Sequence, residues 1–489
     1  MKLSSIVGIS SVVCLGLVSV SAQEARPSLE QLQQQLKQIQ ENFQKTQAEH
    51  QKQIEALTRQ LDAVQKQQAD SAGKEKIKEQ IGTGLAAQPN LLPPAPELKQ
   101  PWSPSQPITV ARSGSAYMNI SFDAIMNAGW STAADPSAYL QLGDHDPLRR
   151  GFSLRNAEIA LDGAVDPYFK GFANIVLKLD SNNETSIELE ETYLQSSSLP
   201  AGLQLKAGQF FAAFGRQNTM HPHQWAFVDA PLILNRTFGP DGLRNPGAQL
   251  SWLVPLPFYT EAFLGVFNGE GGTAYSFRNG GEPDALGINR YAGRATSGGH
   301  VSGFADLLFV PRIASSFELT DNQTLLTGVS AAFGPNDTGA DSRTEIYGAD
   351  IFWKWKPSTA QAGFPFVSVQ SEFLYRRFGA AADPTAAPAL PAENIRDWGF
   401  YSQVSYGFRE RWIAGLRGEF VTGNNAFLDG VDVFRGDRTR ISPALTFLPS
   451  EFSKLRLQYN YDRGQNFGDD HSIWLQMEFM LGAHGAHKY

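Results

Sequence analysis

The sequence contains a single cysteine, Cys14, and no run of the roughly 20 consecutive apolar residues that a membrane-spanning helix needs. Cys14 lies within an expected secretory signal at 1–22, where Lys2 precedes an apolar stretch and Ala22 ends a small-residue cleavage site. The apolar stretch is too short to span a membrane, so the signal predicts export and removal. The mature chain would then have no cysteine, which excludes disulfides and thiolate metal sites.

Positive charge is also in short supply, because 41 Lys and Arg stand against 49 Asp and Glu, a net charge of −8 at pH 7. An acidic surface repels a phosphate backbone, so nucleic acid is an unfavourable partner. The sequence also has no G-x-S-x-G, H-E-x-x-H or P-loop pattern. We therefore expect neither an enzyme nor a bound cofactor.

Aromatic residues and glycine, by contrast, are abundant: 32 Phe, 14 Tyr, 9 Trp and 45 Gly. Without a long apolar run, this composition fits two classes of protein. One is a soluble all-β protein, and the other is a transmembrane barrel, in which apolar and polar residues alternate along each strand.

Two segments precede the region rich in aromatic residues. Residues 28–70 are Gln-rich, with apolar residues at alternating spacings of three and four and one interruption near His50, which predicts a periplasmic α-helical coiled coil with a stutter. Residues 71–113 are rich in proline, which predicts an extended spacer. Through the coiled coil the protein could contact the cell wall or another periplasmic component, so a structural, envelope-tethering role stays open.

Residues 114–489 are predicted to form an all-β transmembrane barrel of about sixteen antiparallel strands. In 472–479, for example, four apolar side chains alternate with polar ones: Ile473, Leu475, Met477 and Phe479. Two soluble sheets packed face to face would share this alternation. The links between the candidate strands, however, alternate between short turns and long loops, which is typical of outer-membrane barrels with periplasmic turns.

The interior of such a barrel is too wide for its own side chains to fill, so we expect a water-filled channel. The alternation predicts that charged residues of both signs line this channel: Lys170, Lys178, Lys206, Asp350, Lys354, Glu372, Arg376, Arg417, Glu419, Arg440, Arg456 and Glu478. Rings of side-chain charge set ion preference. A mixture of both signs does not predict a pore for anions alone.

The segment 215–247 is much longer than most loops of compact domains and follows the fifth candidate strand. We expect it to fold inward and narrow the channel. Five charged residues would then lie at the constriction: Arg216, Asp229, Arg236, Asp241 and Arg244.

A metal site is the competing interpretation of the same segment. His221 and His223 flank one proline, and an extended backbone there would place both imidazoles on one side. Asp229 could add an oxygen, and His484 and His487 follow in the tail. First-row transition metals accept such nitrogen and oxygen donors.

Four stretches carry a family resemblance: "LQLKAGQFFAAFG", "HPHQWAFVDAPL", "GPDGLRNPGAQLSW" and the tail "MLGAHGAHKY". They resemble the phosphate-selective porin O/P family, especially its coiled-coil-bearing branch, whose members are often labelled zinc-regulated or TonB-dependent outer-membrane receptors. The resemblance covers roughly 114–489. It implies a sixteen-stranded, usually homotrimeric channel in the outer membrane of a Gram-negative bacterium.

The predicted function is therefore passive diffusion of ions and small hydrophilic solutes through the outer membrane, with anions such as phosphate among the candidates. The alternatives are a zinc-linked or TonB-associated receptor or transporter, and an envelope tether. A TonB-dependent receptor needs 22 strands and a plug, whereas heptads and prolines precede this barrel.

Overall fold

The computed structural model describes residues 107–482 except 181, 198, 285–286, 425 and 430–433. The predicted signal, the predicted coiled coil, most of the spacer and the tail from 483 lie outside the described residues. Within the described part, no helix is both long and apolar enough to cross a membrane.

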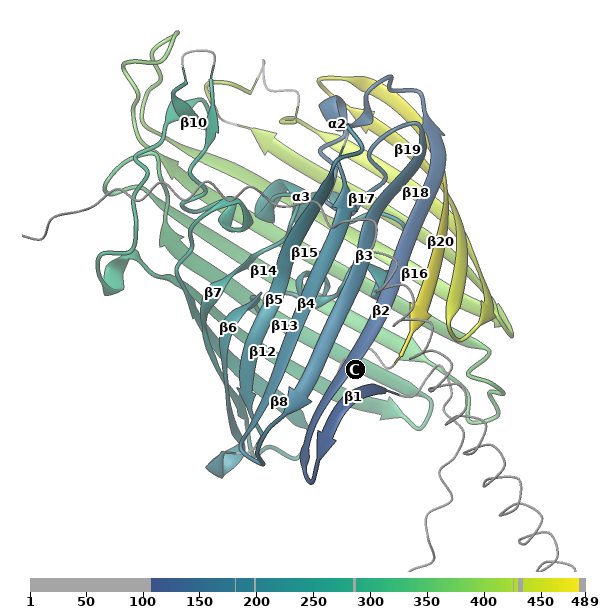
Figure 1. Cartoon of the computed structure of the whole chain (residues 1–489). Coiled ribbons are helices and arrows are strands. Elements are labelled where there is room, and N and C mark those ends of the chain that lie inside the picture. Colours follow the sequence, from purple (N-terminus) through teal and green to yellow (C-terminus); the bar gives the residue numbers. More distant parts are fainter. Residues whose placement is uncertain are drawn as a thin grey trace, which may run out of the picture. The chain divides into compact units, whose positions relative to one another are not determined.

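Sixteen antiparallel strands pair in sequence order and close into a barrel, as the sequence predicted (Figure 1). The strands are β2 (Ala116–Ser131), β3 (Gly151–Ala164), β4 (Phe169–Leu179), β5 (Thr185–Ser196), β6 (Leu203–Phe211), β7 (Arg244–Leu253), β8 (Tyr259–Phe267), β12 (Leu308–Thr320), β13 (Gln323–Pro335), β14 (Arg343–Trp355), β15 (Phe366–Ala380), β16 (Glu393–Arg409), β17 (Trp412–Asn424), β18 (Arg438–Ser450), β19 (Ser453–Gly464) and β20 (Gly468–Leu481). Pairing of β20 with β2 closes the ring.

A further strand, β1 (Ile108–Ser113), precedes the barrel and pairs with the first part of β2. Ile108 lies opposite Ile120 on β2, and Leu481 at the end of β20 lies opposite Phe122. The strands β1 and β20 therefore follow one another along the same edge of β2.

The barrel wall has its apolar side chains outside and its polar side chains inside. On β20 the exposed residues are Ile473, Leu475, Met477 and Phe479, each 44 to 49 % exposed. The buried residues between them are Asp470, Ser472, Trp474, Gln476 and Glu478. A soluble protein buries its apolar side chains instead, so this inverted pattern fits a wall that faces lipid.

The links between strands also follow the predicted alternation. One end of the barrel carries the short links: 165–168, 197–202, 254–258, 321–322, 356–365, 410–411 and 451–452. The other end carries the links 132–150, 180–184, 212–243, 268–307, 336–342, 381–392, 425–437 and 465–467. The longest of these contains a small sheet of its own, formed by β9 (Glu282–Pro283), β10 (Asn289–Tyr291) and β11 (Arg294–Ala295).

Candidate functional site

The loop between β6 and β7, residues 212–243, folds into the barrel, and we call it the inward loop. It contains η2 (Gln217–Thr219), η3 (Pro222–Gln224) and α3 (Leu232–Phe238), and every residue of α3 is buried. The helix packs against β15, β16 and β17 and is seen inside the barrel in Figure 1. It ends at Gly239, whose φ of 78° suits glycine and whose added Cβ would meet the Tyr275 ring.

One side of the inward loop packs as an apolar core. The rings of Phe214 and Phe238, both buried, lie 5.0 Å apart in a T-shaped arrangement. Phe210 on β6 and Phe267 on β8 join the same buried cluster, with ring centroids 5.2 Å apart. The loop is therefore fixed by side-chain packing against the wall, since aromatic pairs bury large apolar areas.

The loop begins against β13 and β15. The N–H of Gly215 donates to Ser330 Oγ at 3.1 Å. The N–H groups of Arg216 and Gln217 both donate to Glu372 Oε1, at 3.1 and 2.6 Å. Glu372, predicted to line the channel, thus satisfies the backbone at the start of the loop.

Asp229 is the main polar anchor of the loop, and three strands hold it. Arg440 Nη1 on β18 lies 3.0 Å from Asp229 Oδ2, and Arg417 on β17 pairs with Oδ1 and donates to the backbone carbonyl at 2.8 Å. Gln458 and Asn460 on β19 donate at 2.8 and 2.9 Å. Burial alone would raise the pKa of Asp229, but the two guanidinium charges and these hydrogen bonds lower it.

Other wall residues hold the loop through its backbone. Arg456 on β19 donates to the carbonyl oxygens of Phe227 and Trp225, at 3.1 and 2.8 Å. The N–H of Leu232, at the start of α3, donates to Glu419 Oε2 at 2.7 Å. Together with the contacts of Asp229, these hydrogen bonds hold the loop against the inner face of β17, β18 and β19, which we call the arginine side.

The opposite chemistry holds His221. Its Nδ1 lies 2.8 Å from Glu190 Oε2 on β5, and its Nε2 lies 3.0 Å from Glu191 Oε2. All three residues are buried. Burial alone would lower the pKa of His221, but the charge of Glu190 and its hydrogen bonds raise it well above its ordinary value.

His223 lies beside His221 and also faces buried carboxylates of the barrel wall. The two imidazole rings stack, with centroids 5.8 Å apart and planes 20° apart. His223 Nδ1 lies 3.6 Å from both Asp123 Oδ2 on β2 and Glu158 Oε2 on β3. The two imidazoles lie side by side, but the expected extended backbone is absent, because His223 lies in η3. Asp229 lies with the arginines of β17 and β18 and not with the histidines.

Arg216 and Asp241, two of the predicted constriction residues, lie near the two ends of the inward loop. The Arg216 guanidinium lies over the Phe352 ring, 4.1 Å from its centroid. Asp241 is grouped with Asp144 and Glu188. Burial, followed by the charges of these two carboxylates, raises the pKa of Asp241 to about 6.

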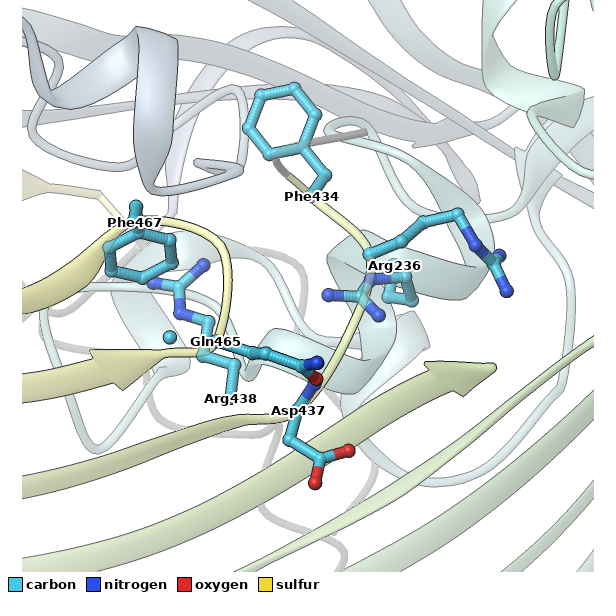
Figure 2. Close-up of a pocket in the computed structure, with 8 residues that line it drawn as sticks. Arg236, Phe434, Asp437, Arg438, Gln465 and Phe467 are labelled. Carbon is cyan, nitrogen blue, oxygen red and sulfur yellow. The ribbon is translucent and has the colours of Figure 1, made fainter. Parts of the chain in front are cut away.

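Arg236, on α3, is buried near the long-loop end of the barrel. Its Nε donates to Gln141 Oε1 at 2.9 Å, and its Nη1 lies 4.0 Å from Asp397 Oδ1. Burial lowers the pKa of Arg236 to about 10, although Asp397 acts in the opposite direction. Figure 2 shows the pocket beside it, which is too narrow for a water-sized sphere and is lined by Arg236, Phe434, Arg435, Asp437, Arg438, Gly464, Gln465 and Phe467.

The prediction that Arg244 belongs to the constriction loop is wrong, because β7 begins at this residue and not at 248. Arg244 is part of the wall, where its guanidinium pairs with Glu188 and donates to the carbonyl of Glu190 at 2.8 Å. Residues 244–247 were assigned to the loop because they include Pro246. A proline is tolerated in a strand wherever its missing N–H is not needed for the ladder, and here Pro246 lies opposite Gln209.

The predicted channel-lining residues differ in how much water reaches them. Eight are buried: Asp350, Glu372, Arg376, Arg417, Glu419, Arg440, Arg456 and Glu478. Lys178 and Lys206 are half-buried, and Lys170 and Lys354 are exposed. Most of the set therefore contacts the loop or a neighbouring strand, where it was expected to line open water.

The buried charges of the wall form close pairs. Arg376 Nε lies 3.0 Å from Asp397 Oδ2, and Lys454 Nζ lies 2.8 Å from Glu478 Oε2. Arg440 Nε lies 2.9 Å from Asp462 Oδ1. The partners Asp397, Lys454 and Asp462 were not among the predicted channel-lining residues, although the period-two alternation would place them on the inner face as well.

No family model matches the chain. An "Uncharacterized protein" of Aquifex aeolicus (strain VF5) is 30% identical over 374 residues, which are 72% of this chain and 74% of that protein. The chain belongs to the family of this Aquifex protein.

Two solved structures are similar to this chain. The outer membrane channel DcaP of Acinetobacter baumannii matches with a TM-score of 0.51 and 11% identity, over 76% of this chain and 99% of that chain. The anion-selective porin from Comamonas acidovorans matches with a TM-score of 0.47 and 7% identity, over 75% of this chain and 100% of that chain. The likeness to DcaP shows a shared porin-type barrel fold.

Proposed function

We propose that this protein is an outer-membrane channel for passive diffusion of ions and small hydrophilic solutes, and that the inward loop sets its width. One observation carries the proposal: apolar side chains are exposed on the outer face, while polar and charged ones face the interior of a closed barrel. Acyl chains outside and an aqueous path inside are the surroundings that suit this distribution.

Weak ion preference follows from the pairing of the interior charges. Arg376, Arg417 and Arg440 each have a carboxylate partner within the wall or the loop. A guanidinium that is already paired offers little to a passing anion, because both charges are largely neutralised. We therefore expect phosphate to be one of several small solutes that the channel passes. We also assign the chain to the phosphate-selective porin O/P family.

The proposal extends to orientation and assembly. The short turns face the periplasm, as in other outer-membrane barrels, and we assign the expected coiled coil at 28–70 to the same compartment. In the first heptads one core position holds Leu29 and Leu36 and the other holds Leu32 and Ile39, a pattern with a weak preference for three or more helices. The working assembly is a homotrimer.

Single-channel recording in planar lipid bilayers tests the width-setting role. Replacing residues 219–240 of the inward loop by a short Gly-Ser linker should raise the conductance severalfold, because the loop no longer occupies the interior. The matched control replaces 384–389, an outer loop at the same end whose residues are mostly exposed, and should leave the conductance unchanged. Equal conductance of wild type and the 219–240 variant would contradict the constriction.

Reversal potentials in a salt gradient test whether the pairing of the interior charges leaves the channel with little ion preference. A value near zero is expected for the wild type, since neither sign of charge dominates. A strongly anion-selective potential would contradict this pairing argument while leaving the channel itself intact. A purified protein that inserts into bilayers and conducts nothing would overturn the channel proposal.

A further inference from the structure

A buried group of nitrogen and oxygen donors joins the inward loop to β2, β3 and β5. We call it the His–carboxylate cluster, and it consists of Asp123, Glu158, Glu190, His221 and His223. All five side chains are at most 5 % exposed. Their ligand atoms form two sets of three that share Glu158, and within each set they lie within 4.8 Å of one another.

The spacing in the first set suits ligands around a common ion. Ligands about 2.1 Å from a tetrahedral metal ion lie about 3.4 Å from one another. His223 Nδ1 lies 3.6 Å from both Asp123 Oδ2 and Glu158 Oε2. These separations approach the edge of such a coordination tetrahedron.

The second set needs only a small adjustment. His221 Nδ1 lies 3.8 Å from Glu158 Oε2, again close to a ligand edge, and 2.8 Å from Glu190 Oε2. The shorter contact has the length of a hydrogen bond. The two sets share one oxygen, Glu158 Oε2, which faces both imidazoles.

The charge balance of the cluster also favours a cation. Three of its five members are carboxylates, and Glu191 adjoins it through His221 Nε2. Lys454 donates to the carbonyl oxygen of His223 at 2.7 Å and is also paired with Glu478, so it does not neutralise the three carboxylates by itself. Buried carboxylates need a counter-charge, and coordination to a metal ion is one of the two common ways to supply it.

Asn174 on β4 supplies an independent observation. It is completely buried, and its Nδ2 donates to Glu158 Oε2 and Glu190 Oε2 at 3.1 and 2.7 Å. Its Oδ1 makes no hydrogen bond within the described part of the chain. The two amide positions are interchangeable by rotation, and rotation would point a further oxygen donor into the cluster.

We propose that the His–carboxylate cluster binds divalent first-row transition-metal ions, such as Zn²⁺, through imidazole nitrogen and carboxylate oxygen. Two imidazoles favour this class over Mg²⁺ and Ca²⁺, which prefer oxygen ligands alone. The histidines come from the inward loop and the carboxylates from three strands. A bound ion therefore fastens the loop to the wall. This inference is independent of what the channel transports.

Zinc binding by the full chain in detergent tests the proposal. After treatment with a chelator, the protein is equilibrated with ZnCl₂ by dialysis, and bound zinc is measured by mass spectrometry. We expect about one to two zinc ions per chain, and an affinity lowered by about 100-fold or more in His223→Ala and in Glu158→Gln. All proteins carry His484→Ala and His487→Ala, so that the tail histidines contribute no zinc.

His300 provides the matched control. Its Nδ1 lies 3.6 Å from Glu270 Oε2, the same separation as in the cluster, but its side chain is 86 % exposed. His300→Ala should leave zinc binding unchanged. A loss of zinc equal to that of His223→Ala would show that any histidine–carboxylate pair suffices and would overturn the assignment to the cluster.

A spectroscopic readout separates loss of a ligand from loss of the fold. Co²⁺ in place of Zn²⁺ should give a visible absorption typical of tetrahedral coordination, which His221→Gln and Glu158→Gln alter. Each variant must still show the heat-dependent gel migration of a folded barrel. The proposal would be overturned if the reference protein, with the cluster intact and the tail histidines replaced, retained no more zinc than His223→Ala or bound Ca²⁺ as tightly as Zn²⁺.

Discussion

The inward loop meets two walls of opposite chemistry. At β17, β18 and β19 the wall supplies guanidinium and amide donors, and the loop supplies the carboxylate of Asp229. At β2, β3 and β5 the wall supplies carboxylates, and the loop supplies the imidazoles of His221 and His223. The wall groups that contact the loop thus differ between the two sides of the barrel, and the loop supplies the partner of opposite charge on each side.

The two walls differ in how they can respond when a partner is removed. A guanidinium cannot lose its proton at accessible pH, so a buried arginine that loses one carboxylate partner stays fully charged. An imidazole can become neutral by losing a proton. We therefore expect substitutions on the arginine side to cost more stability than those on the carboxylate side.

Removal of Asp229 should have the largest effect. In Asp229→Ala, Arg417 and Arg440 lose a shared partner and keep Glu419 and Asp462, respectively. This loss should lower the free energy of unfolding by about 3 kcal/mol, the lower end of the range for a broken buried pair. Urea unfolding of the protein folded in lipid measures this difference. Asp229→Asn keeps a hydrogen-bond acceptor and should cost less. A loss below about 1 kcal/mol for the alanine variant would contradict the anchoring role.

A pH-dependent effect of up to about 3 kcal/mol is expected at Asp146, near the arginine side. Its Oδ1 accepts from the N–H of Ala230 at 2.8 Å, and burial, followed by the charge of Asp229, raises its pKa from 3.8 to about 6. A raised pKa means that the folded state favours the protonated acid. The stabilising contribution is therefore complete below about pH 4 and is lost as the pH rises through about 6.

The variant Asp146→Asn isolates this contribution, because an amide stays neutral across the range. Relative to the wild type, the variant should gain stability between pH 4 and pH 7, as measured by urea unfolding at each pH. A difference between the two proteins that stays constant with pH would contradict the raised pKa. In an Asp229→Asn background the transition should move to lower pH, since one source of the shift is removed.

On the carboxylate side, Glu190→Gln should cost about 2 kcal/mol in metal-free protein, less than Asp229→Ala. Glu190 contacts His221 at 2.8 Å and His145 at 3.4 Å, and both imidazoles can lose a proton when the carboxylate is gone. Unfolding in urea with a chelator present measures the loss. A cost equal to that of Asp229→Ala would break the proposed difference between the walls.

The smallest effect is expected at an exposed pair. Arg377 Nη1 lies 3.5 Å from Glu345 Oε1, and the two side chains are 46 and 36 % exposed. Glu345→Ala should change the free energy of unfolding by less than about 0.5 kcal/mol, because solvent screens the pair. A larger loss would mean that ion pairs outside the barrel matter as much as those beneath the loop.

The barrel could be predicted from the sequence because apolar residues that face lipid alternate with polar residues that face the interior along each strand. On β20 the apolar residues Ile473 and Leu475 alternate with Ser472 and Gln476, and local alternation is enough to infer an inner and an outer face. The alternation was less informative at the strand ends. Pro246 and Gly247 were predicted to lie in a loop, although they belong to β7.

The contacts of the inward loop could not be inferred in the same way. Asp229 was recognised as a loop charge, but its partner Arg417 lies 188 positions further along the chain. Alternation assigns Arg417 to the inner face and does not say which loop residue it meets. His221 and His223 were likewise found from their spacing, whereas the convergence of Glu158 and Glu190 on them depends on the register of three strands.

The placement of β1 has a consequence for the connectivity of the barrel. Ile108 and Leu481 pair with positions only two residues apart on β2, Ile120 and Phe122, so about 7 Å separates them along the strand direction. A few residues joining Gly482 to Pro107 would make the barrel a covalently continuous ring. Such a circularly permuted chain can begin and end at another hairpin, such as the tight turn after Arg409, while every strand keeps its neighbours.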